Sequence, residues 1–318
     1  MLSVAGGIGG RPVGVDGGFT RRQFLFAAGA GLGVVVAAGL GAAELVDHGV
    51  LPGKSVLDRL DGACSVSVPP LHFASVGPTI SGQFQSQARQ TTVGYSIAYP
   101  PGHAPGDALP LIVMLHGFGG NHRSAFAGMQ PAQGLALEVD AEPLTPMAMA
   151  TVDGGGGYWN PHPGDDPMAM VVDELVPMCQ GMGLGHPPKG IATMGISMGG
   201  YGAILIAERY PHMFSAVAAI SPAIWTTYSE ARQANAGAYA SAADFAACDA
   251  VTHAGALAGI PVRVASGDAD PFHRGVVAFA QGSPPSVHVV LTTGCHTGDF
   301  FTAQEVPSMV FLSQHLGT

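Results

Sequence analysis

A serine in this chain lies in a setting that could make it a nucleophile. Ser197 occupies the centre of the segment GISMG, with Gly195 two places before it and Gly199 two places after it. An apolar segment that reads as a strand precedes this serine, and a helical pattern follows it. A turn from strand to helix over so few residues forces strained backbone geometry on its apex and admits only small neighbours. Such a turn would present the hydroxyl of Ser197 as a nucleophile.

An acid and a histidine follow two later segments that read as strands. The segment VRVAS leads into Asp268 and Asp270, and VHVVLTT leads into His296. A serine hydroxyl is a weak nucleophile near neutral pH, so it needs an imidazole to take its proton and a carboxylate to orient that imidazole. The chain order of serine, acid and histidine is the order found in α/β-hydrolases. We therefore predict a catalytic triad with Ser197 as nucleophile and His296 as base.

The acid of this triad is predicted to be Asp270 and not Asp268. The residue directly after Gly267 is still leaving the strand, whereas the residue three places after it has rounded the turn and can reach the loop of His296. Asp268 is then interpreted as a turn former whose side chain binds nearby backbone N–H groups.

Two further strand ends carry glycine-rich segments. The segment HGFGG follows LIVML, and a loop of this kind can aim a backbone N–H at a developing oxyanion. We expect the N–H groups of Phe118 and Met198 to be the two donors, and His116 to shape the loop without reacting. Tyr158 and Trp159 follow DGGGG and are predicted to bind substrate; the alternative is that these rings pack beneath a loop.

The elements that position these residues follow a regular alternation. Strands are predicted at 92–100, 111–117, 147–153, 190–197, 216–221, 262–267 and 287–294, and helical patterns at 166–182, 198–210 and 302–316. This alternation predicts an α/β-hydrolase fold, with a mostly parallel sheet and helices on both faces. Ligands bind such sheets at the carboxyl ends of the strands. Residues 222–258 interrupt the alternation and are predicted to form a small lid.

Residues 1–43 resemble a targeting segment. Arg21 and Arg22 are followed by Gln23, Phe24 and Leu25, which is the twin-arginine export pattern, and a weakly apolar stretch comes next. We expect export in a folded state, to a secreted, cell-wall or membrane-anchored location; an uncleaved membrane anchor is the alternative. Residues 44–90 are interpreted as a stalk and edge segment, and residues 91–318 as the catalytic domain.

The composition excludes several function classes. The chain has 318 residues, a formal net charge of −10 and no run of Lys or Arg, so we expect no nucleic-acid partner. The four cysteines have no metal-binding spacing and no HExxH motif occurs, so we expect no metal and no other cofactor. Export would permit disulfides, but buried free thiols are the simpler interpretation of these cysteines.

Four segments together resemble a known family. LHGFGG, GISMGGYGA, GDADPF and GCHTGDFF are similar to segments of the esterase D and S-formylglutathione hydrolase branch of α/β-hydrolases, which also includes the mycobacterial antigen 85 proteins. The similarity covers about residues 92–316. It implies a nucleophile at Ser197, oxyanion donors at Phe118 and Met198, and a histidine at His296. It also places the acid before a Pro-Phe pair, as at Asp270.

The chain departs from both branches of that family. Antigen 85 proteins use a glutamate acid and an Ala-rich turn, and formylglutathione hydrolases are cytosolic. We therefore expect an exported serine carboxylic-ester hydrolase that acts on a small-molecule or lipid ester through an acyl-enzyme on Ser197. Two alternatives remain open at this point: an acyltransferase that moves the acyl group to a sugar or lipid alcohol, and a catalytically inactive binding protein on the same fold.

Overall fold

The structure is a computed structural model that describes residues 58, 62–68, 75–126, 134–139 and 142–317. The predicted signal at 1–43 and much of the predicted stalk lie outside the described residues. Residues Asp58–Thr318 form one compact unit, and its described part holds the sheet and its helices. No helix in the described part of the chain is long and apolar enough to cross a membrane.

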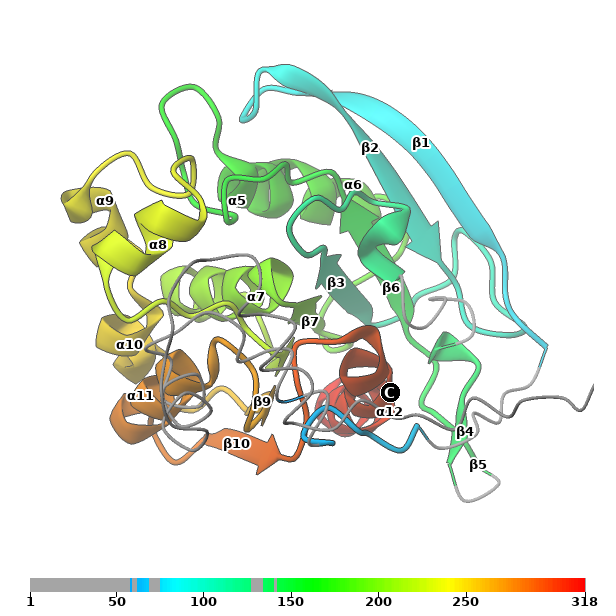
Figure 1. The fold of residues 1–318 in the computed structure, drawn as a ribbon. Helices are drawn as coiled ribbons and strands as arrows, with labels where there is room; N and C mark the ends of the chain where they lie inside the picture. The colour runs from blue at the N-terminus through cyan, green and yellow to red at the C-terminus, as the bar shows by residue number, and fades with distance from the viewer. Residues whose placement is uncertain (1–57, 59–61, 69–74, 127–133, 140–141, 318) are drawn as a thin grey trace, which may run out of the picture. The chain divides into compact units, whose positions relative to one another are not determined.

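One eight-stranded sheet organises this unit, in the order β1-β2-β6-β3-β7-β8-β9-β10 (Figure 1). Its strands are β1 (Thr79–Ser86), β2 (Thr91–Ala98), β3 (Leu111–Leu115), β6 (Ala148–Val152), β7 (Ile191–Ile196), β8 (Ala216–Ile220), β9 (Val262–Gly267) and β10 (Val287–Thr292). The six strands from β6 to β10 in this order run parallel, and β2 pairs antiparallel with both β1 and β6. The mostly parallel sheet predicted from the sequence is thus confirmed.

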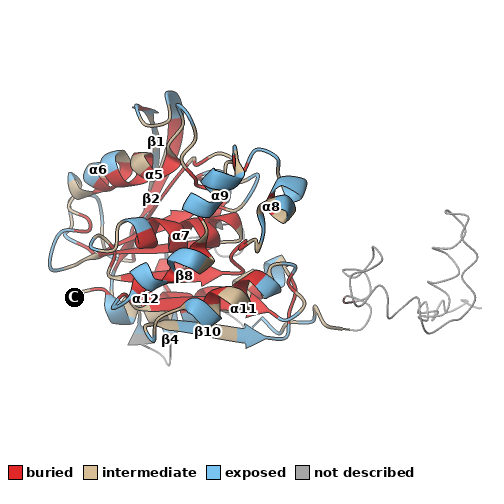
Figure 2. Cartoon of the chain, turned by 90° about the vertical axis from the view of Figure 1, so that its left-hand side faces the viewer, coloured by how far each residue is buried: buried red, intermediate tan, exposed pale blue. Residues whose placement is uncertain are grey.

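The central strands are buried on both faces because their side chains alternate between two apolar clusters. In β3, Leu111, Val113 and Leu115 belong to one cluster, while Ile112 and Met114 belong to the other. Every residue of β3 is buried, whereas β10 is only partly covered (Figure 2). The sheet therefore has a buried centre and an exposed edge at β10.

Helices cover the two faces of this sheet. The first face is covered by a continuous helical stretch made of α5 (Pro167–Ala169), the π-helix η2 (Met170–Leu175) and α6 (Val176–Gln180), and also by α7 (Met198–Arg209). The π-helical turn adjoins Pro177, which has no N–H to donate to the preceding turn. The second face is covered by α12 (Gly298–His315), which contributes Phe300, Met309 and Leu312 to the core.

Residues between β8 and β9 form an irregular helical insertion, which includes the whole of the region predicted as a lid. It contains α8 (Tyr228–Ala234), α9 (Ala242–Ala247), α10 (Ala250–His253) and the short 3-10 helix η3 (Ala254–Leu257). After β9, α11 (His273–Gly282) returns the chain toward β10. The smaller elements are the 3-10 turn η1 (Ser124–Phe126) and the two-residue strands β4 (Glu138–Val139) and β5 (Glu142–Pro143), which pair with each other.

A buried carboxyl group on α7 gives the fold a dependence on pH. Glu208 is 7% exposed, and neither of its carboxyl oxygens has a hydrogen-bond partner among the described residues. Burial, with a smaller contribution from Asp249, raises the pKa of Glu208 to about 9. This side chain is therefore protonated and neutral in the folded protein at pH 7.

We predict that Glu208 makes the folded state less stable as pH rises from about 5 to 9. Over that range the folded protein holds a proton that the unfolded chain releases, so the free energy of unfolding falls by up to about 1.4 kcal/mol per pH unit. In Glu208→Gln this slope should disappear. Urea titrations at pH 5, 6, 7 and 8 measure it. Asp173→Asn, which neutralises an exposed carboxyl on η2, is the control and should keep the wild-type slope.

Candidate active site

Ser197 lies at the apex of the turn from β7 to α7, in the strained conformation that its two glycine neighbours permit. Its backbone has φ 58° and ψ −120°, a region that residues with a side chain rarely adopt. A Cβ on Gly195 would lie 2.1 Å from the carbonyl oxygen of Gly199, and a Cβ on Gly199 would lie 1.9 Å from that of Leu115. The spacing of the two glycines is thus a steric requirement of the turn.

Backbone hydrogen bonds from the neighbouring elements hold this conformation. The N–H of Ser197 donates to the carbonyl of Ile220 at the end of β8, at 2.9 Å. The carbonyl of Ser197 accepts from the N–H groups of Ala223 and Tyr201, both at 3.0 Å. A strained residue persists only where its surroundings fix it in this way.

The structure brings Ser197, His296 and Asp270 into one hydrogen-bonded row. Ser197 Oγ lies 2.9 Å from His296 Nε2, and His296 Nδ1 lies 2.9 Å from Asp270 Oδ2. With the Nδ1 proton donated to Asp270, Nε2 is free to accept the proton of the serine hydroxyl. The row therefore has the geometry needed to remove a proton from Ser197.

Asp270 is held more tightly than the histidine that it orients. Its side chain is fully buried, and its second oxygen accepts from the N–H of Phe272 at 2.8 Å. The side chain of His296 is 23% exposed, and its ring packs edge-on against Phe272 and Phe301 at 5.2 and 5.0 Å between centroids. The aromatic rings restrict the imidazole on two sides and leave one edge open toward Ser197.

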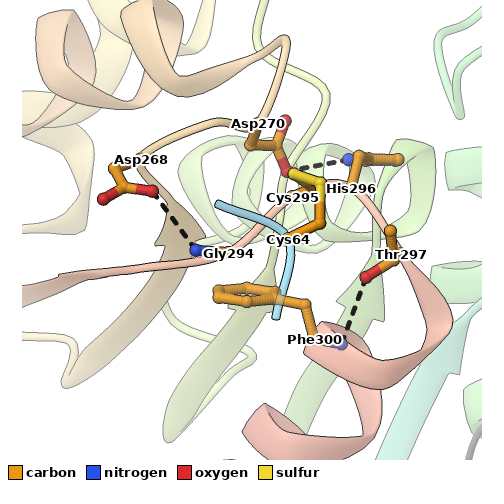
Figure 3. Close-up of a disulfide and its surroundings, with 8 residues drawn as sticks. All are labelled: Cys64, Asp268, Asp270, Gly294, Cys295, His296, Thr297 and Phe300. Atoms are coloured by element: carbon orange, nitrogen blue, oxygen red, sulfur yellow. Dashed lines mark hydrogen bonds and ion pairs between the residues drawn. A yellow bond between two sulfur atoms is a disulfide. The ribbon is translucent and has the colours of Figure 1, made fainter. Parts of the chain in front are cut away.

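Asp268 lies outside this row. Its side chain and its backbone both hydrogen-bond to the backbone around the loop that carries His296. Its Oδ1 accepts from the N–H of Gly294 at 3.2 Å, and it is an exposed residue (Figure 3). The backbone N–H of Asp268 donates to Thr292, and that of Ala269 donates to Gly294. Asp268 therefore ties the turn after β9 to the turn after β10.

The glycine-rich loop after β3 is fixed by a histidine that does not face the serine. His116 Nδ1 donates to the carbonyl of Gly117 at 2.8 Å, and its Nε2 accepts from the N–H of Gly154 at 2.9 Å. Burial lowers the pKa of His116, which keeps this imidazole neutral near pH 7 and able to make both bonds. His116 thus links the loop after β3 to the end of β6.

The two predicted oxyanion donors come from two different strand ends. Phe118 is on the loop after β3, and Met198 is the first residue of α7, directly after Ser197. No backbone hydrogen bond within the described residues uses the N–H of either residue. The amino end of α7 also carries the positive end of its helix dipole, which favours negative charge beside Ser197.

A cavity of about 590 Å³ opens beside Ser197 and His296. It is lined by Gly117, Phe118, Gly119, Gly120, Ser124, Ala125, Ile196, Ser197, His296, Gly298 and Phe301. No Asp, Glu, Lys or Arg side chain occurs among these lining residues. The described part of the chain contains no cluster of His, Cys, Asp and Glu that could hold a metal ion.

Tyr158 and Trp159 are not among the residues that line this cavity. Trp159 is 1% exposed; its indole N–H donates to the carbonyl of His116 at 3.1 Å, and its ring packs against that of His116. Tyr158 is 5% exposed and packs against Tyr201 and Tyr239. The structure therefore places these rings in the core beneath the site, where Trp159 supports the loop that carries Phe118.

The interpretation of the cysteines as free thiols is wrong for one pair. Cys64 and Cys295 form a disulfide, whereas Cys179 and Cys248 are free and buried. The bridge joins residues separated by 231 positions, so only the folded arrangement brings them together. In the sequence, the position of Cys295 directly before His296 was the one signal that could have marked this cysteine as important.

A strand-to-helix nucleophile turn and a triad geometry on a mostly parallel sheet define an α/β-hydrolase. The family model described as "Putative esterase" matches residues 86–275. The chain therefore belongs to this esterase family, and it is a serine carboxylic-ester hydrolase of the α/β-hydrolase superfamily. No curated protein matches it in sequence.

Solved structures share the fold at low sequence identity. A ferulic acid esterase is 18% identical, with a TM-score of 0.66, and the match covers 77% of this chain and all of that one. An S-formylglutathione hydrolase from Agrobacterium tumefaciens is 19% identical (TM-score 0.59; 79% and 100% covered). The feruloyl esterase module from Clostridium thermocellum, complexed with sinapinate, is 12% identical (TM-score 0.56; 80% and 97% covered).

We predict that Asp270→Asn and Asp268→Asn differ sharply in their effect on ester hydrolysis. An amide at position 270 would favour the wrong tautomer of His296, and such a change can lower kcat about 10⁴-fold. An amide at position 268 still offers an oxygen to the N–H of Gly294, so kcat should change far less. Initial rates with a p-nitrophenyl ester, on samples matched by circular dichroism, measure both. The reverse ranking would assign the acid to Asp268.

Proposed function

We propose that this protein is an exported esterase that hydrolyses uncharged carboxylic esters through an acyl-enzyme on Ser197. The observation that carries the proposal is the row from Ser197 through His296 to Asp270, with both contacts at 2.9 Å, beside a cavity of about 590 Å³. Ser197 and His296 both line this cavity, in which a substrate would lie.

In the proposed first half-reaction, Ser197 Oγ attacks the ester carbonyl carbon while His296 Nε2 takes the hydroxyl proton. The Asp270 carboxylate stabilises the imidazolium that forms. The backbone N–H groups of Phe118 and Met198 donate to the oxyanion of the tetrahedral intermediate. When this intermediate collapses, His296 returns the proton to the departing alcohol, and the acyl group remains on Ser197.

In the second half-reaction the same groups act on water. His296 takes a proton from a water molecule as the water oxygen attacks the acyl carbon, and then returns it to Ser197 Oγ as the acid leaves. An alcohol in place of water would give acyl transfer with the same residues. Product analysis with and without an added alcohol acceptor distinguishes the two reactions.

The lining of the cavity supports an uncharged substrate. Phe118 is 63% exposed at the cavity, and Phe301 and Ile196 add further apolar surface. A thioester of glutathione carries two carboxylates, and the lining residues offer no cation to pair with them. The match to feruloyl esterases, one of them solved with the aromatic acid sinapinate, agrees with an apolar or aromatic acyl group.

We predict that Ser197→Ala loses ester hydrolysis and covalent labelling together. Removal of the nucleophile of a serine hydrolase lowers kcat on the order of 10⁶-fold, whereas the smaller alanine leaves the turn intact. A panel of neutral p-nitrophenyl esters of increasing acyl length, and a fluorophosphonate probe, measure the two effects. Cys248→Ala, away from the cavity, is the matched control and should label normally. Wild-type turnover in a folded Ser197→Ala sample would refute the proposal, and a wild-type enzyme that neither labels nor turns over would indicate an inactive binding protein.

Two features support export. One is the twin-arginine pattern at Arg21 and Arg22, which lies outside the described residues. The other is the Cys64–Cys295 disulfide, because disulfides form and persist in oxidising compartments and are rare in the reducing cytosol.

We predict that replacing Arg21 and Arg22 by lysine retains the protein in the cytoplasm. Twin-arginine signals are addresses read by a receptor, so the equal charge of lysine should not substitute for arginine. Fractionation of cells that express the wild type and the double variant, followed by immunoblotting, measures the distribution. A double variant that is exported as efficiently as the wild type would eliminate the twin-arginine route.

A further inference from the structure

The loop that carries His296 follows a strand with little support. β10 is the last strand of the sheet and pairs only with β9. None of its residues is fully buried, and Leu291 is 44% exposed. Ser197, in contrast, follows β7, which lies between β3 and β8 at the buried centre of the sheet. The two halves of the proton-transfer pair therefore rest on supports of very different rigidity.

A disulfide reaches this loop one residue before the histidine. Cys295 is 7% exposed and is bonded to Cys64, with their Cα atoms 4.8 Å apart. Figure 3 shows the bridge beside the hydrogen bond between Asp270 and His296, with Cys64 on a separate segment that lies against the histidine loop. Val66, on the same segment as Cys64, packs against the apolar cluster to which α12 contributes.

The other anchors of the loop act on its backbone on either side of Cys295. Gly294 donates to Asp268, and a Cβ at Gly294 would lie 2.3 Å from the ring of Phe300. Thr297 donates to the carbonyl of Cys295 at 2.8 Å, and its side chain caps α12. The disulfide is the covalent attachment among these contacts, and it joins the loop to a part of the chain that precedes the whole sheet.

We propose that the Cys64–Cys295 disulfide is a positioning element for His296, so that the esterase reaches full turnover only when this pair is oxidised. The inference rests on the proposed function of Ser197 and His296. Without the bridge, the loop would be held only by hydrogen bonds and packing contacts such as that of Gly294 with Asp268, and the imidazole would sample positions away from Ser197 and Asp270. A displacement of about 1 Å at a catalytic group can cost on the order of 10²-fold in rate.

The Cys64–Cys295 disulfide can be reduced by a two-electron exchange with a dithiol. A thiolate of the dithiol attacks one sulfur of the bridge and the other cysteine leaves as a thiolate. The second thiol of the reagent then displaces the first cysteine and closes a cyclic disulfide. Cys64 is only partly buried, which gives the reagent access. If the protein is exported from a reducing cytosol, oxidation after export would complete the active site.

The experiment uses three full-length proteins: the wild type, Cys64→Ala and the control Cys248→Ala. Each is assayed before and after reduction with dithiothreitol. Thiol titration after denaturation verifies the redox state, since two of the four cysteines are bridged in the oxidised form. Assays run well below the lowest measured Tm, and near-ultraviolet circular dichroism monitors the fold. The readouts are kcat and KM for one p-nitrophenyl ester and the rate of fluorophosphonate labelling.

We expect reduction to lower kcat and the labelling rate roughly 10- to 100-fold, with KM changed less than about threefold, because the substrate cavity remains while the base is displaced. Reoxidation should restore the kcat and the labelling rate of the wild-type protein. Cys64→Ala should match the reduced enzyme and show no further response to reductant, and Cys248→Ala should behave as the wild type.

Three results would overturn the positioning role. These are an unchanged kcat in a reduced sample with four titratable thiols, a loss of kcat accompanied by loss of the near-ultraviolet signal, and a rise in KM without a fall in kcat. Each of them leaves the oxidised enzyme active. Failure of the proposed function is distinguishable because the oxidised wild type itself would then neither label nor hydrolyse the ester.

Discussion

The left-handed backbone at Ser197 is the constraint on which the rest of the site depends. A residue with a side chain held in such a sparsely populated region costs on the order of 1–3 kcal/mol, and surrounding contacts must offset that cost. Here they come from three directions, namely the carbonyl of Ile220, the N–H of Ala223 and the first turn of α7. The same geometry that strains the serine points its hydroxyl out of the sheet and places the N–H of Met198 at the free end of a helix. The proposed nucleophile and one of the two proposed oxyanion donors are thus produced by one turn.

The order of the strands explains how distant residues converge on that turn. The loop of Phe118 follows β3, Ser197 follows β7, Asp270 follows β9 and His296 follows β10. These strands are parallel, so their carboxyl ends lie along one edge of the sheet in the order β3-β7-β8-β9-β10. β8 contributes no member of the proposed triad. It lies between the serine and the acid, and its end supplies the backbone groups that hold Ser197 in place.

The parts of this arrangement that the sequence could predict are those with a local signal. Seven strands, the main helices and the residues at the strand ends follow from apolar runs bounded by glycine, proline and aspartate, because burial on two faces demands such runs. The strand β1 lies within the segment interpreted as a stalk and edge segment, whereas the short ladder of β4 and β5 carries no such pattern. The placement of Tyr158 and Trp159 also could not be decided, since an aromatic residue after a glycine loop fits a cavity wall and a core equally well. The pairing of Cys64 with Cys295 depends on the tertiary fold alone.

That disulfide can act on the protein in two physically separate ways. Closing a loop of 231 residues restricts the unfolded chain, which in the chain-entropy model stabilises the folded state by on the order of 5 kcal/mol. This effect does not depend on where in the folded protein the bridge lies, and it leaves kcat unchanged as long as the protein is folded. The second effect is local, because the bridge meets the backbone beside the proposed base, in the loop that follows the edge strand β10. A bridge anywhere between the ends of the catalytic domain would serve stability. Only one next to His296 can also set the distance between the imidazole and the serine, and this is the reason to separate turnover from stability when the bridge is opened.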